Sequence, residues 1–166
     1  ILYESEPSYL ILMERKLIIR NFGAIASADI ALKDFNIFIG EQGAGKSTVA
    51  KLITIFENSR DKVLKVDSDY LMTKFSEYNI ISYFNPDSYI SYSSEQGDIT
   101  YEDGSFNFTF SYHSTSHNLY IPAERFFIST FSRSIATLVL SKAPIPVTLL
   151  EFASFYEKAK NLFVNY

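Results

Sequence analysis

The residues with the most specific chemistry lie in one short loop. Residues 40–47 read GEQGAGKS and match the pattern G-x-x-x-x-G-K-[ST]. Glycines in this pattern let the backbone curl, so that successive N–H groups point at phosphate oxygens. Lys46 is then expected to reach the terminal phosphates as a point charge, and the hydroxyl of Ser47 to ligate Mg²⁺. The pattern therefore predicts a binding site for the phosphates of a nucleotide.

The prediction includes Thr48, which follows the motif and is placed so that its hydroxyl or N–H would contact the first phosphate. The alternative is a glycine-rich turn that binds nothing. The flanking sequence disfavours this alternative, because the motif needs a buried strand before it and a helix after it. The predicted nucleotide-binding residues are Gly40, Glu41, Gln42, Gly43, Ala44, Gly45, Lys46, Ser47 and Thr48.

Two elements must position this loop. Residues 35–39 form a near-continuous apolar run, which is typical of a strand buried on both faces. After the loop, a helix is expected from Ser47 to about Glu57, because its apolar residues recur with helical spacing. That apolar stripe consists of Val49, Leu52, Ile53 and Phe56.

Two strands are predicted before these elements. The first is a short apolar run at residues 17–19, and a turn at residues 21–23 ends it. The second alternates over residues 24–32 and is expected to bury its even-numbered side chains. Three of these side chains are alanines, which leave room for a close neighbour on the buried side.

The remainder of the chain alternates between helical and strand patterns. A helix is predicted over residues 68–83, strands over 88–121, and further helices over 123–141 and 147–165. Asp67 and Asp69 resemble an acidic metal pair, but capping of the helix that follows is the favoured interpretation. His113 and His117 are four residues apart without a third ligand, so a polar turn is favoured over a metal site.

The composition excludes several classes of protein. The 166 residues include 15 Phe and 12 Tyr but no Cys, so disulfides and thiolate metal sites are excluded. No run approaches the roughly 20 apolar residues of a membrane span, and the N-terminus lacks the pattern of a signal peptide. A cytoplasmic protein without membrane contact is therefore expected. The net charge of −4 argues against a surface that binds nucleic acid along the whole chain.

The charge is unevenly distributed along the chain. Residues 14–65 hold nine Lys and Arg against six Asp and Glu, whereas residues 66–141 hold three against nine. A phosphate ligand would therefore be favoured by the first third, although a surface charge that merely varies along the chain is an equal alternative.

The phrase LIIRNFGAIASADIALKDFNIFIGEQGAGKSTVAKLI, from residue 17 onward, resembles the opening of SMC-like and ABC-type ATPase heads. Within that group it is similar to bacterial AAA-type ATPases related to overcoming-lysogenization-defect nucleases and other phage-defence ATPases. Residues 119–125, LYIPAER, resemble a second phrase of these proteins. The resemblance implies an α/β P-loop NTPase fold: a first lobe with a mixed sheet, an antiparallel β subdomain and C-terminal helices. It also implies ATP and Mg²⁺ as cofactors, a second ATPase head as partner, and DNA as a possible partner.

The chain departs from this family after residue 146. The signature phrase near L-S-G-G, the apolar run that ends in Asp-Glu (Walker B) and the switch His are all missing. The chain is therefore expected to be a first lobe, residues 13–122, followed by the start of a helical arm, residues 123–166. Residues 1–12 are expected to be an N-terminal extension or a cloning remnant.

The resemblance also suggests catalytic residues. Where the family carries a Gln near Pro122, this chain has Ala123, so Glu124 is proposed to take that role beside Lys46. A surface Glu that caps a helix is an equal alternative. Arg125 could contact nucleotide, although an ordinary surface Arg is favoured.

Three functions follow for the chain as a whole. The first is an ATP-binding lobe that binds Mg-ATP and needs a missing C-terminal lobe and a second head for hydrolysis, so that alone it is inactive or weak. The second is a small P-loop kinase, which the scarcity of arginine beyond Arg60 disfavours. The third is a scaffold module in which the loop is only structural.

Overall fold

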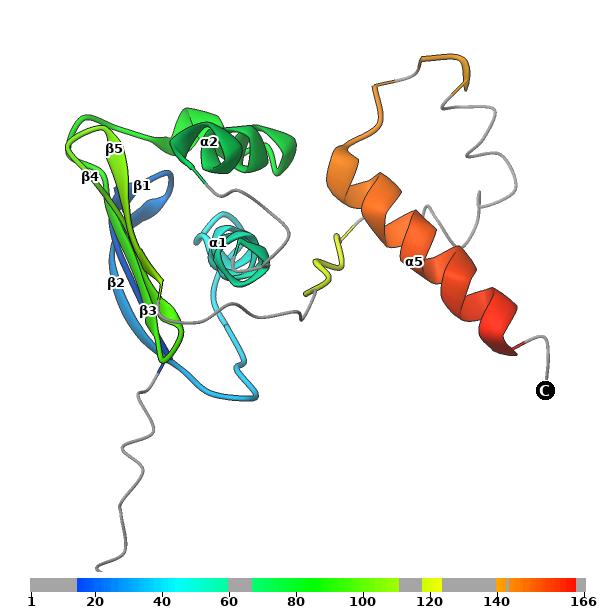
Figure 1. Ribbon diagram of the computed structural model, residues 1–166, viewed down its shortest axis with the longest axis horizontal. Helices are drawn as coiled ribbons and strands as arrows, with labels where there is room; N and C mark the ends of the chain where they lie inside the picture. The colour runs from blue at the N-terminus through cyan, green and yellow to red at the C-terminus, as the bar shows by residue number, and fades with distance from the viewer. Residues whose placement is uncertain (1–14, 60–66, 111–117, 124–139, 143, 164–166) are drawn as a thin grey trace, which may run out of the picture.

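The computed structural model describes residues 15–59, 67–110, 118–123, 140–142 and 144–163. Within them, an antiparallel sheet carries two helices on one face, and a third helix lies further along the chain (Figure 1). The helix predicted over residues 123–141 lies mostly outside the described residues. The elements are β1 (Arg15–Phe22), β2 (Ile25–Leu32), α1 (Lys46–Asn58), α2 (Ser68–Glu77), the 3-10 turn η1 (Ile81–Tyr83), β3 (Tyr89–Ser94), β4 (Gly97–Glu102), β5 (Ser105–Phe110) and α5 (Val147–Phe163).

The sheet has the strand order β2-β1-β3-β4-β5. Every neighbouring pair is antiparallel, so the mixed sheet that was expected is not found among the described residues. The β4–β5 hairpin turns at Asp103 and Gly104, both with positive φ, as the Asp-Gly pair predicts. The antiparallel β subdomain is therefore present, whereas a parallel strand layer is not part of the described structure.

The buried face of β2 differs from the prediction of even-numbered burial. Ile25 is buried and Ala26 is exposed, although Ala28 and Ile30 do pack against the core. The reason lies in the neighbouring strand β1, where Asn21 has a left-handed φ of 49°. The backbone turn there brings Phe22 into the core, and Phe22 pairs with Ile25 in the register. A simple alternation along one strand does not predict such an interruption in its neighbour.

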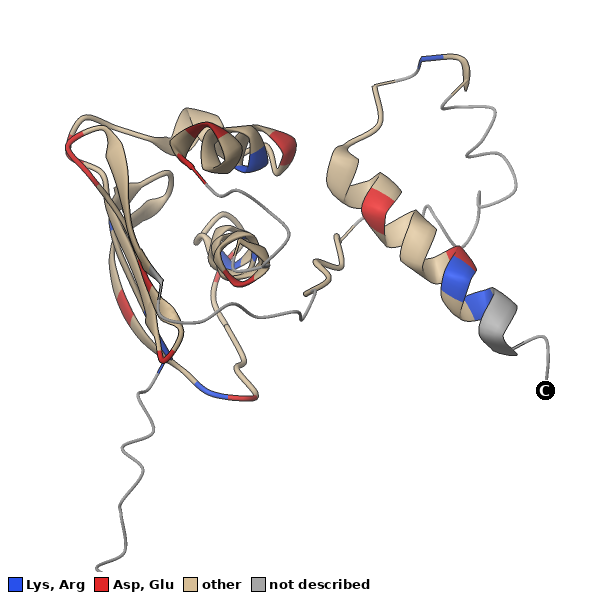
Figure 2. Cartoon of the chain, viewed as in Figure 1, with Lys and Arg blue, Asp and Glu red and all other residues tan. Residues whose placement is uncertain are grey.

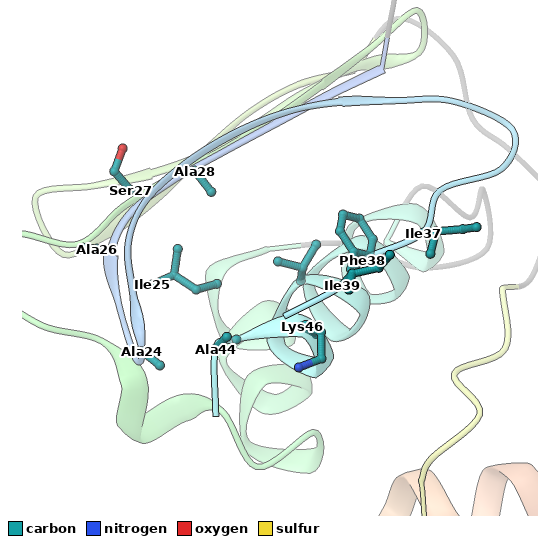
Figure 3. Close-up of a pocket in the computed structure, with 12 residues that line it drawn as sticks. Ala24, Ile25, Ala26, Ser27, Ala28, Ile37, Phe38, Ile39, Ala44 and Lys46 are labelled. Atoms are coloured by element: carbon teal, nitrogen blue, oxygen red, sulfur yellow. The ribbon is translucent and has the colours of Figure 1, made fainter. Parts of the chain in front are cut away.

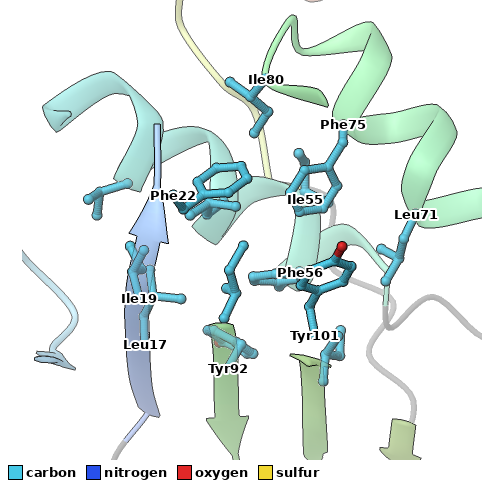
Figure 4. Packing of buried hydrophobic residues seen from close by; sticks show 14 of the residues in the cluster. Leu17, Ile19, Phe22, Ile55, Phe56, Leu71, Phe75, Ile80, Tyr92 and Tyr101 are labelled. Atoms are coloured by element: carbon cyan, nitrogen blue, oxygen red, sulfur yellow. The ribbon is translucent and has the colours of Figure 1, made fainter. Parts of the chain in front are cut away.

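The core fills the space between the sheet and the two helices α1 and α2 (Figure 4). Aromatic rings supply much of it, as expected for a chain so rich in Phe and Tyr. Phe75 of α2 contacts the rings of Phe22, Phe56, Phe84 and Phe106 at centroid distances of 4.9–6.1 Å. The helix that begins at the 40–47 loop is thus fixed against both the sheet and α2.

A buried carboxylate anchors the far end of α1. Glu57 accepts a hydrogen bond from the Tyr92 hydroxyl of β3. The guanidinium of Arg15, on β1, lies 3.6 Å from the same carboxylate. A carboxylate in this position is stable because it is both paired and hydrogen-bonded. The anchor fixes the position of α1 along the sheet, and hence the position of the loop at its other end.

The strand predicted over residues 35–39 is the largest error of the sequence analysis. This segment belongs to no strand, and Phe35, Ile37 and Ile39 are 80%, 69% and 92% exposed. An apolar run predicts burial only if some other element covers it, and none of the described elements does so. Phe38 alone packs against the core.

The helix predicted over residues 68–83 ends earlier, at Glu77. Asn79 adopts a left-handed φ of 54°, and its N–H and that of Ile80 bond back to Ser76 and Phe75. Such a left-handed residue closes a helix because it turns the chain off the helical path.

At the start of α2, Asp67 accepts a hydrogen bond from the N–H of Tyr70 at 2.9 Å, which confirms the predicted capping.

The helix α5 agrees with the prediction of a helix from residue 147. It approaches the end of α2, where Tyr78 donates to the carboxylate of Glu151 at 3.4 Å. Burial, and then the charge of Glu151, raise the pKa of Tyr78 well above its usual value, so the phenol remains protonated and donating.

Within the described residues, no helix combines the length and the apolar character needed to cross a bilayer.

Candidate nucleotide-binding site

The 40–47 loop leads directly into the N-terminus of α1. Gly43 and Gly45 have φ values of 84° and 87°, a conformation that glycine adopts without steric cost. Gly45 is the N-cap of α1, and no side chain caps the helix. The N–H groups of Lys46, Ser47 and Thr48 have no acceptor among the described residues. Unpaired amides at a helix N-terminus attract an anion, and the helix dipole adds to the attraction.

Lys46 extends back across the loop. Its ammonium donates to the carbonyl oxygens of Gly40 at 2.8 Å and Glu41 at 2.5 Å. The N–H of Ala44 also bonds to the Glu41 carbonyl, at 3.3 Å, and closes a turn inside the loop. The positive charge therefore lies over the mouth of the loop, where phosphate oxygens can replace the two carbonyl acceptors.

The remaining predicted residues fall into two groups. Glu41, Gln42, Gly43, Ala44 and Ser47 are exposed, so a ligand can reach them from solvent. Thr48 is buried in the first turn of α1, and its contact with a phosphate remains a prediction. Glu124, Arg125, His113 and His117 lie outside the described residues.

Gly45 lies against a residue that sequence analysis did not connect with the site. A Cβ at this position would lie 2.5 Å from Cγ1 of Ile25, on β2. Gly43, in contrast, has open space in the direction of a Cβ. The loop is therefore seated on the sheet at Gly45, and Ile25 is the residue that supports it.

This contact gives a prediction for stability. Gly45→Ala should destabilise the chain by more than Gly43→Ala, because both changes strain a left-handed residue but only Gly45→Ala adds a clash. We expect Gly43→Ala to cost about 1–2 kcal/mol and Gly45→Ala about 1–2 kcal/mol more. Urea unfolding measures both losses. In an Ile25→Ala background the extra cost of Gly45→Ala should vanish; equal costs in both backgrounds would contradict the proposed contact.

A second segment lies along α1, although 60 residues or more separate the two in sequence. Asn118 exchanges two hydrogen bonds with Asn58 at the C-terminal end of the helix, at 2.8 and 2.6 Å. Tyr120 lies under the ammonium of Lys51, with 5.8 Å from Nζ to the ring centroid. Pro122 and Ala123 share a cavity with Ser47 at the N-terminal end. Residues 118–123 thus run along α1 toward the loop.

The donors around Ser47 can be compared with what Mg²⁺ requires. Within the described residues, no three His, Cys, Asp or Glu side chains form a cluster that could hold a metal by themselves. Mg²⁺ in nucleotide sites needs no such cluster, since it takes one or two protein ligands, phosphate oxygens and waters. An exposed Ser47 hydroxyl at the mouth of the loop fits this requirement.

A cavity of about 450 Å³ flanks the loop on the other side (Figure 3). It lies between β2 and the extended residues 37–39, and Lys46 borders it. Ala24, which precedes β2, and Ala26 and Ala28 of β2 line it, although Ala24 and Ala26 are exposed rather than on a buried face as predicted. Its lining is mostly apolar, so phosphates are not expected in this cavity but at the amides of the loop.

Charge is mixed over the described elements (Figure 2). Arg20 pairs with Asp29 at 2.7 Å, and Arg15 lies near Asp34 and Glu57, so these two arginines are locally balanced. Lys46 bonds instead to backbone carbonyls. Its charge is therefore available to an anion at the loop.

A glycine loop that brings unpaired amides and a lysine to the start of a helix is the kind of site that nucleotide-binding domains use. The chain belongs to the AAA ATPase domain family, whose model matches residues 13–158. This membership indicates nucleotide binding and ATPase activity. Comparisons with curated proteins and with solved structures gave no match.

Proposed function

We propose that this chain is the Mg-ATP-binding lobe of an SMC/ABC-like ATPase, with the 40–47 loop as its Walker A motif. The observation that carries the proposal is the loop itself: three unpaired amides begin α1, and the Lys46 ammonium bonds to carbonyls of the same loop. The amides and the lysine bind the phosphates, and the hydroxyl of Ser47 holds the metal. Mg²⁺, when bound, neutralises charge on the terminal phosphates.

Hydrolysis also needs a group that orients or activates water. We propose that a carboxylate of a further lobe and a signature phrase of a second head complete the site, as the resemblance to SMC/ABC-like heads implies. Glu124 is the candidate that we propose within this chain, because it follows Pro122 and Ala123 in sequence and these two residues line the cavity beside Ser47. The chain alone should therefore bind Mg-ATP with little turnover.

Calorimetry with ATP, in Mg²⁺ and in EDTA, tests the proposal. The chain should bind ATP in both conditions and more tightly with Mg²⁺. Ser47→Ala should remove most of the gain from Mg²⁺ and leave binding in EDTA nearly unchanged, because the loop amides remain. Absence of ATP binding would support the scaffold alternative. Phosphate transfer by the monomer at about 1 s⁻¹ or faster would support the kinase alternative.

A further inference from the structure

A second cavity, of about 240 Å³, adjoins the loop at Ser47. Four parts of the chain that are far apart in sequence form its walls: α1, Asn79 after the end of α2, residues 120–123, and the start of α5 with the preceding Pro146. Ser47 belongs both to this cavity and to the 40–47 loop. The cavity therefore begins where the terminal phosphate of a bound nucleotide is expected.

Thr148 is the unusual residue of this cavity. It is only 6% exposed, yet its hydroxyl has no hydrogen-bond partner within the part of the chain that the structure describes. Its backbone N–H also lacks an acceptor, whereas those of Leu149 and Leu150 both bond to the carbonyl of Pro146. Although the residue as a whole is buried, its hydroxyl borders the cavity, where it can hydrogen-bond to a polar ligand.

The other polar groups of the cavity are mainly hydrogen-bond donors. Lys51 lies one helical turn beyond Ser47, and its ammonium, which donates to the Tyr78 carbonyl at 2.9 Å, brings positive charge to the wall. Asn79 contributes an amide. None of the described lining residues carries a carboxylate; that of Glu151 accepts the Tyr78 hydroxyl instead. A donor-rich, positively charged cavity selects an anion.

We propose that this cavity is an oxyanion subsite that holds a tetrahedral phosphate through the Thr148 hydroxyl and N–H, with the charge of Lys51. The site itself rests on the geometry of the cavity, and its interpretation as an ATP phosphate rests on the proposed function. The phosphate has two possible sources. It is either the terminal phosphate of bound ATP or orthophosphate that remains after hydrolysis.

The test uses orthophosphate on the full chain that carries Lys46→Ala, which weakens phosphate binding at the loop and leaves the cavity intact. We expect the amide NMR signal of Thr148 to shift saturably with orthophosphate. Thr148→Val should weaken this binding at least tenfold in calorimetry, whereas Thr148→Ser, which keeps the hydroxyl, should largely preserve it. Thr54→Val is the matched control, because Thr54 is equally buried but bonds to the Ala50 carbonyl within α1.

Two results would overturn the subsite: a Thr148 amide that does not respond to orthophosphate, or equal affinities for the Thr148→Val and Thr54→Val proteins. ATP and ADP titrations of the chain with native Lys46 then separate the sources. If the terminal phosphate of ATP occupies the cavity, Thr148→Val weakens the binding of ATP more than that of ADP. If only free phosphate occupies it, the affinities for both nucleotides are unchanged. If the chain bound no nucleotide, the proposed function would be contradicted. The orthophosphate test would still decide whether the subsite exists.

Discussion

Replacement of Lys46 by alanine is expected to weaken Mg-ATP binding by about 100-fold, which corresponds to about 2.7 kcal/mol. The ammonium of Lys46 can exchange its two carbonyl partners, Gly40 and Glu41, for phosphate oxygens. Hydrogen bonds between charged groups contribute about 1.5–3 kcal/mol each, so the loss of this side chain accounts for an effect of that size. Most of the affinity for AMP, which lacks the terminal phosphates, should remain.

A thermal shift measures the same effect. Mg-ATP at about 100 times its dissociation constant stabilises the native chain by about 2.7 kcal/mol, which for this size raises Tm by roughly 5–10 °C. At the same ATP concentration, Lys46→Ala should show a shift of only 1–2 °C, as an order-of-magnitude estimate. Lys16→Ala is the matched control, because Lys16 is exposed on β1. Equal shifts for both variants would contradict a phosphate-binding role for Lys46.

Replacement of Phe75 by alanine should produce the largest loss of stability, about 3–5 kcal/mol in urea unfolding. Its ring is fully buried and joins α2 to β1, α1 and β5 through three aromatic contacts. Since domains have only about 5–15 kcal/mol of total stability, this loss is a large share. Phe35→Ala removes the same atoms from an exposed position and should change stability by less than about 0.5 kcal/mol. Comparable losses of stability for the two variants would contradict the burial of Phe75 in the core.

Local patterns predicted the elements that local chemistry specifies. The helix α1 was expected from Ser47 to about Glu57 and is found at Lys46–Asn58, because its apolar stripe and the glycine before it are both visible in sequence. The hairpin at Asp103 and Gly104 and the cap at Asp67 depend on neighbouring residues only. The chemistry of the 40–47 loop is predictable for the same reason.

Features that depend on tertiary contacts were either not predicted from the sequence or predicted wrongly. The apolar run at residues 35–39 predicts burial but carries no information about what would cover it. The support of Gly45 by Ile25 arises because a left-handed Asn21 changes which residues of the β1–β2 hairpin face inward. The meeting of Ser47, Lys51 and Thr148 joins residues about 100 positions apart, which no motif spacing could indicate.

Residues 35–39 also have a consequence for the behaviour of the chain at high concentration. The run FNIFI combines high β-propensity with the absence of charge and proline, which is the composition of an aggregation-prone segment. Lys33 and Asp34 on one side, and Glu41 on the other, flank the run with charges, which are expected to disfavour the stacking of copies. We therefore expect the exposed segment that leads into the loop to make the isolated chain prone to self-association as its concentration rises.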